Sequence, residues 1–138
     1  MLQPRMSVPY PVRVLLVEDN EADTQQALTI FNTLGLEVQS AITVLAARNY
    51  LEDVTAGTHL APHLIVLDLS FALDSGFEVL RCWKSNPGLQ TIQIIVWARA
   101  GEQERKLAAY FHVAAVAQKS QGPKQLENAL KHAISALA

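Results

Sequence analysis

The chain has only one cysteine, Cys82, among its 138 residues, and its charged residues nearly cancel to a formal net charge of −2. One cysteine excludes an internal disulfide and is typical of a reducing compartment, so we expect a cytoplasmic protein. The lack of a basic excess argues against nucleic-acid binding, because such domains usually carry a strongly basic face. No apolar run approaches the roughly 18 residues that a membrane-spanning helix needs, which argues against a membrane protein.

The sequence also lacks the motifs of two kinds of binding site, a phosphate-binding loop and a zinc site. It has no glycine-rich loop of the type that cradles phosphates, and the first strand is followed by acidic residues that repel them. A small nucleotide or flavin carrier is therefore a weak hypothesis. The four histidines are scattered without the spacing of metal ligands, which argues against a zinc site.

Hydrophobic residues make up half of the chain, which is enough for one core of ordinary domain size. Residues 1–11 contain three prolines and no apolar segment of the kind found in signal peptides. We therefore expect an N-terminal tail at 1–11 and a single domain at 12–138.

Short apolar runs alternate with segments of helical period along this domain. Strands are expected at 12–17, 36–41, 63–67, 92–97 and 113–118, and helices at 23–34, 44–54, 77–84, 102–111 and 123–137. Asn20 is the expected N-cap of the first helix, and Gly35 stands where a residue that ends it is expected. This alternation predicts an α/β protein with a parallel sheet, right-handed crossovers and helices on both faces. The expected fold is a flavodoxin-like, doubly wound (βα)5 sheet.

Carboxylates follow two of the most hydrophobic strands. Glu18 and Asp19 come directly after the first strand, and Asp68 comes directly after the third. Open α/β sheets hold their ligands at the carboxyl ends of the strands, where these side chains are expected to meet. Three carboxylates at one place make a hard-oxygen site suited to Mg²⁺.

These residues belong to motifs that resemble a known family. The motifs are Val-Leu-Leu-Val-Glu-Asp-Asn at 14–20, Leu-Ile-Val-Leu-Asp-Leu at 64–69, Ser-Gly-Phe-Glu-Val-Leu at 75–80, and Lys119. Together they resemble the receiver domain of response regulators in two-component signalling, from residue 12 to the C-terminus. Ala-Tyr-Phe-His-Val at 109–113, and Lys119-Ser120 where most receivers have Lys-Pro, are similar to the small phytochrome-associated regulators that consist of a receiver alone.

The resemblance implies a role for each charged residue. Asp68 is the implied phosphoacceptor, which receives a phosphoryl group from a histidine kinase, with a phytochrome-like kinase as one candidate. Glu18, Asp19 and Asp68 are the implied ligands of Mg²⁺, which neutralises charge during phosphoryl transfer. Lys119 is implied to pair with a phosphoryl oxygen. The resemblance thus implies a phosphoacceptor signalling protein rather than an enzyme in the ordinary sense.

The chain departs from the family at the residues that usually move on activation. Receivers usually carry Ser or Thr at the end of the fourth strand, but counting from Lys119 places Trp97 there and counting from Asp68 places Ala98 there. Neither supplies a hydroxyl. The aromatic residue that usually rotates corresponds to Val116, which is stiff at χ1 and has no polar tip. Trp97 is expected either to fill or shield the phosphoryl pocket or to pack under the fourth helix.

Two functional hypotheses follow from these matches and departures. The first is a working phosphoacceptor in a phosphorelay, and the second is a pseudo-receiver that acts as a phosphorylation-independent interaction module. The four charged residues together favour the first, and the lost hydroxyl and aromatic favour the second.

The last helix raises a separate question of assembly. Its apolar residues are Leu126, Leu130, Ala133, Ile134 and Leu137. They predict either a helix packed on the sheet or a homodimer surface shared with the fourth helix and the fifth strand.

Overall fold

The computed structural model of the chain describes residues 8–69, 73–99 and 101–138, and the side chains of residues 73–76 are outside this description. Most of the expected tail, residues 1–7, lies outside the described residues, as does the side chain of Ser75 in the 75–80 motif. In the described part, no helix is both long enough and apolar enough to cross a membrane.

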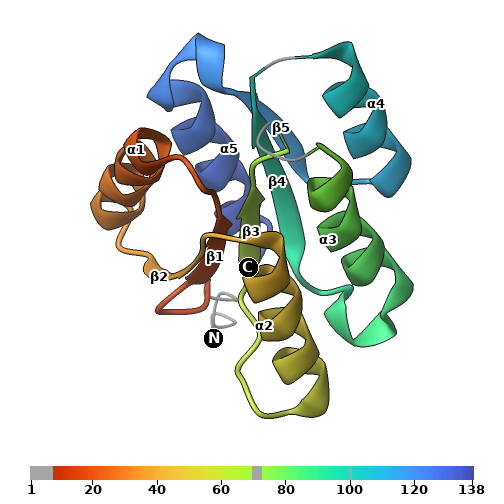
Figure 1. The fold of residues 1–138 in the computed structure, drawn as a ribbon. Helices are drawn as coiled ribbons and strands as arrows, with labels where there is room; N and C mark the ends of the chain where they lie inside the picture. Colours follow the sequence, from red (N-terminus) through yellow and green to blue (C-terminus); the bar gives the residue numbers. More distant parts are fainter. Residues whose placement is uncertain (1–7, 70–72, 100) are drawn as a thin grey trace, which may run out of the picture.

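Strands and helices alternate along the chain as expected (Figure 1). The strands are β1 (Arg13–Val17), β2 (Glu37–Ala41), β3 (Leu64–Leu67), β4 (Gln93–Ala98) and β5 (Ala115–Gln118). The helices are α1 (Glu21–Thr33), α2 (Val44–Ala56), α3 (Leu73–Ser85), α4 (Glu102–Phe111) and α5 (Pro123–Ser135), with two short 3₁₀ turns at Pro87–Leu89 and Lys119–Gln121.

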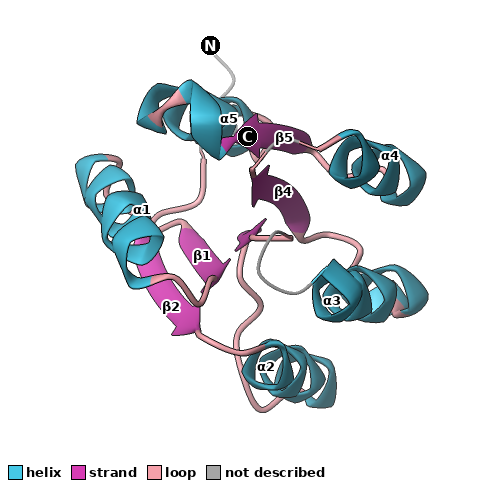
Figure 2. Ribbon diagram, turned by 45° about the horizontal axis from the view of Figure 1, so that its top comes forward, coloured by secondary structure: helices cyan, strands magenta, loops and turns pink. Residues whose placement is uncertain are grey.

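The strands form one parallel sheet in the order β2-β1-β3-β4-β5. Helices α1 and α5 cover one face, and α2, α3 and α4 cover the other (Figure 2). The predicted doubly wound flavodoxin-like fold is therefore confirmed. Because all strands run the same way, their carboxyl ends share one edge of the sheet.

Burial explains the pattern of each strand. β1 and β3 are central and buried on both faces, which is why their sequences are nearly continuous apolar runs. β2 is an edge strand whose residues are mostly exposed, which matches its alternating sequence. The two central strands can therefore hold polar groups rigidly where they end.

The ends of the helices were predicted well for α1 and less well for α3. Asn20 caps α1 by accepting a hydrogen bond from the backbone N–H of Asp23, and Gly35 follows the helix with φ +70°. The start expected for the third helix, after Gly76, is wrong, because α3 already begins at Leu73. Glycine is costly inside a helix but does not prevent one.

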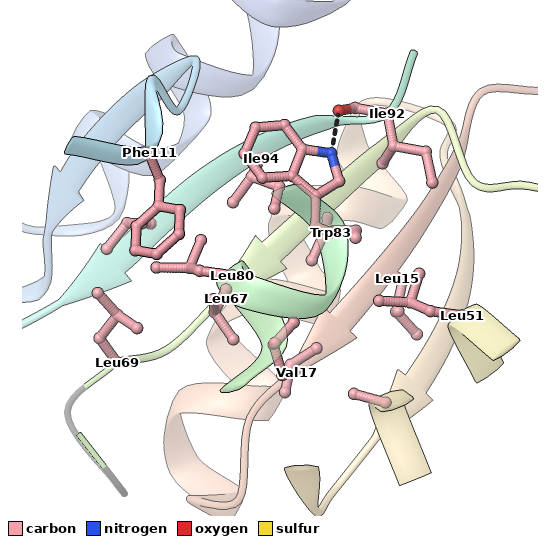
Figure 3. Packing of buried hydrophobic residues seen from close by; sticks show 14 of the residues in the cluster. Leu15, Val17, Leu51, Leu67, Leu69, Leu80, Trp83, Ile92, Ile94 and Phe111 are labelled. Atoms are coloured by element: carbon pink, nitrogen blue, oxygen red, sulfur yellow. Dashed lines mark hydrogen bonds between the residues drawn. The ribbon is translucent and has the colours of Figure 1, made fainter. Parts of the chain in front are cut away.

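The core is divided by the sheet into two clusters. The cluster under α2, α3 and α4 contains Trp83, whose indole N–H donates to the carbonyl of Ile92 at 3.0 Å (Figure 3). Cys82 packs against this cluster and is half-buried. The cluster under α1 and α5 contains Phe31 and Trp97.

Helix α5 uses most of its apolar residues inside the molecule. Leu126, Leu130 and Ala133 are buried in the second cluster, and Ile134 and Leu137 pack against it. The apolar excess that suggested a dimer surface is therefore largely covered by packing within the chain. A homodimer through α4, β5 and α5 stays a prediction.

His63 directly precedes β3, at the amino end of the strands. Its environment predicts how the stability of the fold depends on pH. Its Nδ1 accepts a hydrogen bond from the backbone N–H of Arg13 at 2.9 Å, which requires an unprotonated ring nitrogen. Burial, and then the charge of Arg13, lower the pKa of His63 below its ordinary value of 6.5. The unfolded chain therefore binds a proton that the folded chain resists, so folding loses stability as pH falls below 6.5.

We expect His63→Asn to remove this loss, because an amide oxygen can accept the same hydrogen bond without titrating. The measurement is urea unfolding of both proteins between about pH 7 and pH 5. The free energy of unfolding should fall more steeply in the unmodified protein. Parallel curves for the two proteins would contradict the assignment to His63.

Candidate functional site

The candidate site lies where β1 and β3 end. The backbone N–H of Glu18 donates to the carbonyl of Ala41 at 3.2 Å, and that of Asp68 donates to the carbonyl of Val17 at 3.0 Å. These bonds extend the parallel ladder by one residue beyond the strands. They fix Glu18 and Asp68 on the carboxyl edge of the sheet, where both are buried with 1% and 2% of their surface exposed.

The carboxylates predicted as metal ligands are brought together. One oxygen each from Glu18, Asp19 and Asp68 lies within 4.8 Å of the others, and Asp19 is exposed whereas the other two are buried. Carboxylate oxygens are the ligands that hard divalent cations prefer, and an open side leaves room for water and substrate oxygens. The donor set therefore fits a divalent cation such as Mg²⁺.

Lys119 reaches into the same place from the end of β5. Its ammonium donates to Glu18 Oε2 at 2.8 Å and to Asp68 Oδ2 at 2.9 Å, and 7% of its side chain is exposed. Buried carboxylates this close repel one another unless a cation lies among them. Lys119 therefore supplies the positive charge that the acidic residues need.

A fourth carboxylate, that of Asp23 on α1, was missed by the sequence analysis. Its Oδ2 accepts a hydrogen bond from the Lys119 ammonium at 2.6 Å, and 18% of its side chain is exposed. Acidic residues in the first turn of a helix usually need no other explanation, because they interact favourably with the helix dipole. The sequence therefore gave no reason to place Asp23 in the site.

The first turn of α1 directs Asp23 toward Lys119. In a capping box, the acidic residue at the third helical position turns back to the N-cap backbone N–H. Here the N-cap is Asn20, and its N–H instead donates to Glu18 Oε1 at 3.1 Å. This leaves the Asp23 carboxylate available to Lys119. The bond from Asn20 to Glu18 is visible only in the structure, so the capping pattern in the sequence did not indicate the role of Asp23.

The pKa values in the site follow from burial and crowding. Burial, and then a hydrogen bond with Asp68, raise the pKa of Glu18 to about 7. Burial alone lowers the pKa of Lys119, but its hydrogen bonds to Asp23, Glu18 and Asp68 outweigh this and raise the pKa above the ordinary value. Lys119 is therefore charged at neutral pH, and Glu18 is near its midpoint without a metal.

Trp97 and Ala98, the two candidates for the Ser/Thr position of the family, lie on opposite faces of the sheet. Trp97 belongs to the cluster under α1 and α5, whereas Ala98 and Val116 lie in or against the cluster under α2, α3 and α4. Trp97 is 1% exposed, and the Lys119 ammonium lies over its ring at 4.7 Å from the centroid. The expectation that Trp97 packs under the fourth helix is wrong, because α4 covers the other face. The Trp97 ring instead packs in the cluster under α1 and α5 and lies against the Lys119 ammonium of the site.

Comparison with known proteins places this geometry in a family. The chain is 30% identical over 98 residues to the polar-differentiation response regulator DivK of Brucella anthropi, and the match covers 69% of this chain and 75% of DivK. The chain belongs to the response-regulator receiver family. No family model matches the receiver, so its assignment depends on relatives and on structure.

Solved structures agree with this assignment. The receiver matches the phosphorylated cyanobacterial phytochrome response regulator RcpA with a TM-score of 0.73 and 30% identity, covering 87% of this chain and 89% of RcpA. It matches the Mn²⁺-bound form of response regulator Rcp1 with a TM-score of 0.73 and 30% identity, covering 86% of this chain and 88% of Rcp1. The predicted resemblance to phytochrome response regulators is therefore confirmed.

Proposed function

We propose that this receiver accepts a phosphoryl group on Asp68 from a histidine kinase, with Mg²⁺ held by Glu18, Asp19 and Asp68. The observation that carries the proposal is the contact of the Lys119 ammonium with Asp68 Oδ2 at 2.9 Å, inside a group of carboxylates suited to a divalent cation. Phosphoryl transfer needs mainly positioning and charge neutralisation, which these residues can supply.

In the proposed step, one bond to phosphorus forms and another breaks. An oxygen of Asp68 attacks the phosphorus of a phosphohistidine, the bond from phosphorus to the histidine nitrogen breaks, and its electron pair stays on the imidazole. The Lys119 ammonium pairs with a phosphoryl oxygen and offsets part of its charge. Mg²⁺, when bound, would neutralise further charge on the phosphoryl oxygens. The exposed position of Asp19 supports access of the donor to this side of the site.

The step proposed for Asp68 does not require the usual activation residues. Ala98 shares its face of the sheet with Val116, which supports assigning Ala98 rather than Trp97 to the Ser/Thr position. Neither Ala98 nor Val116 has a polar group, so we infer that this receiver signals without the hydroxyl and aromatic movements described for its family. The similarity to the cyanobacterial phytochrome response regulator RcpA supports a phytochrome-like kinase as the partner. We place the receiver at residues 12–138.

Acetyl phosphate with Mg²⁺ provides the direct test. We expect the protein to gain the mass of one phosphoryl group, because Asp68 can attack a small acyl phosphate in the same way as a phosphohistidine. Asp68→Asn should abolish the gain, since an amide is a far weaker nucleophile. The measurement is intact mass spectrometry after an acid quench, with and without a chelator.

Asp53→Asn is the matched control, because Asp53 is an exposed aspartate in the last turn of α2 and outside the acidic group. It should be phosphorylated like the unmodified protein. No mass gain in the unmodified protein, or an equal gain in Asp68→Asn, would overturn the proposal and favour a phosphorylation-independent interaction module.

A further inference from the structure

The three carboxylates that accept hydrogen bonds from Lys119 differ in what else they can bind. Glu18 and Asp68 belong to the group that could hold a divalent cation, whereas Asp23 does not. When a cation or a phosphoryl group arrives, Glu18 and Asp68 gain a new partner. Asp23 keeps Lys119 as its partner, and its 2.6 Å contact is the shortest of the three.

Asp23 also pulls Lys119 in a fixed direction. The carboxylate lies on the first turn of α1, which is held to the edge of the sheet by the Asn20 cap and by the bond from Asn20 N–H to Glu18. Lys119 directly follows β5, the edge strand that β3 and β4 separate from β1. A charge-assisted hydrogen bond between Asp23 and Lys119 therefore holds one donor of the ammonium on the α1 side of the site, while the same ammonium also contacts Asp68 Oδ2 at 2.9 Å.

We propose that Asp23 is a positioning residue that competes with the phosphoryl group for Lys119, and so weakens the hold of this receiver on phosphate. The inference rests on the proposed function and adds to it a residue that sets the strength of the phosphorylated state. An ammonium has three donors, and one of them is committed to Asp23 throughout. Removing the Asp23 charge leaves Lys119 free to pair more strongly with the phosphoryl oxygens.

Beryllofluoride with Mg²⁺ is the probe, because it mimics a phosphoryl group on an aspartate without covalent chemistry. We expect Asp23→Asn to bind beryllofluoride about tenfold more tightly than the unmodified protein, as estimated for one hydrogen bond to a charged group. The measurement is a titration followed by ¹⁹F NMR. Asp23→Ser is a second variant that keeps the test valid if the amide impairs folding.

Two controls separate positioning from a general effect of charge. Glu21→Gln removes one negative charge from the same turn of α1, but Glu21 is exposed, so its effect should stay below about twofold. In a Lys119→Gln background, Asp23→Asn should have no effect, because the proposed competition acts through Lys119. An equal gain in that background, or no gain with Lys119 present, would overturn the inference.

A measurement without metal distinguishes this inference from the proposed function. In the metal-free protein, the ¹H–¹⁵N signal of the Lys119 ammonium should be protected from exchange, and Asp23→Asn should weaken that protection while Glu21→Gln should not. If the unmodified protein fails to bind beryllofluoride and gains no phosphoryl mass, the proposed function is wrong. The inference about Asp23 is then wrong as well if Asp23→Asn leaves the ammonium signal unchanged.

Discussion

Lys119→Met is expected to lower the free energy of unfolding by about 3 kcal/mol near pH 8 without metal, as estimated for removing one partner from a buried ion pair. The change leaves the carboxylates of Glu18, Asp23 and Asp68 together without their cation. Methionine keeps an unbranched side chain of similar length, so the loss reports mainly on charge. For a domain of this size, it corresponds to a fall in Tm of about 10 °C.

Two conditions should reduce this loss. Near pH 5, Glu18 binds a proton, because its pKa is raised to about 7, and one of the uncompensated charges disappears. Saturating Mg²⁺ should stabilise Lys119→Met more than the unmodified protein, because the metal replaces the missing positive charge. The measurement is urea unfolding near pH 5 and pH 8, with a chelator or with Mg²⁺.

Lys124→Met is the matched control for this prediction. Lys124 pairs with Glu127 at 2.9 Å, but 75% of its side chain is exposed. An exposed ion pair contributes at most about 1 kcal/mol, so this variant should differ little from the unmodified protein under all conditions. Equal losses in Lys119→Met and Lys124→Met would show that the acidic residues do not depend on Lys119.

Glu18→Gln should have the opposite effect on the metal-free protein. The carboxyl of Glu18 ionises at about 7 when folded, against an ordinary value of 4.5. Between these values the folded protein holds a proton that the unfolded chain has lost, so stability falls as pH rises from 4.5 to about 7 and stays low above it. Glutamine cannot ionise, so the variant should be more stable near pH 8 by about 2 kcal/mol.

Mg²⁺ should make the unmodified protein more stable than Glu18→Gln, which is the reverse of the order expected without metal. Glu18→Gln removes one of the three carboxylates that could hold the metal, so we expect its affinity for Mg²⁺ to fall about tenfold or more. Glu18→Gln is therefore expected to be more stable than the unmodified protein in chelator, and to gain less free energy of unfolding from Mg²⁺. Urea unfolding with and without metal measures both effects, with Glu21→Gln as the control. Lower stability of Glu18→Gln in chelator near pH 8 would contradict the raised pKa.

The sequence was sufficient to predict the fold and the acidic side of the site. The alternation of apolar runs and helical segments determines a parallel sheet, and a parallel sheet brings the residues after β1 and β3 together. Asp23 could not be predicted in the same way. Its direction depends on a hydrogen bond between the Asn20 backbone and the Glu18 side chain, which is a three-dimensional detail of one turn.

Trp97 and Ala98 show a second limit of sequence reasoning. Counting from Asp68 and counting from Lys119 differ by one residue, because the chain between these anchors is one residue short of the family spacing. A shift of one residue in a strand moves a side chain to the opposite face of the sheet. Only the packing of β4 between its neighbours separates the two, with Trp97 toward α1 and α5 and Ala98 toward α2, α3 and α4.

The position of the Lys119 ammonium over the indole of Trp97 gives this receiver an optical reporter of its own. A cation above an aromatic ring interacts with its π-electrons, so the emission of Trp97 depends on where Lys119 lies. Trp83 lies on the opposite face of the sheet, and its indole N–H donates to the carbonyl of Ile92. The cation near its ring is Lys84, 5.8 Å from the centroid, which belongs to the last turn of α3 and not to the site, so Trp83 provides a reference. A metal, a phosphoryl group or a kinase that moves Lys119 can therefore be followed in the native protein without a label.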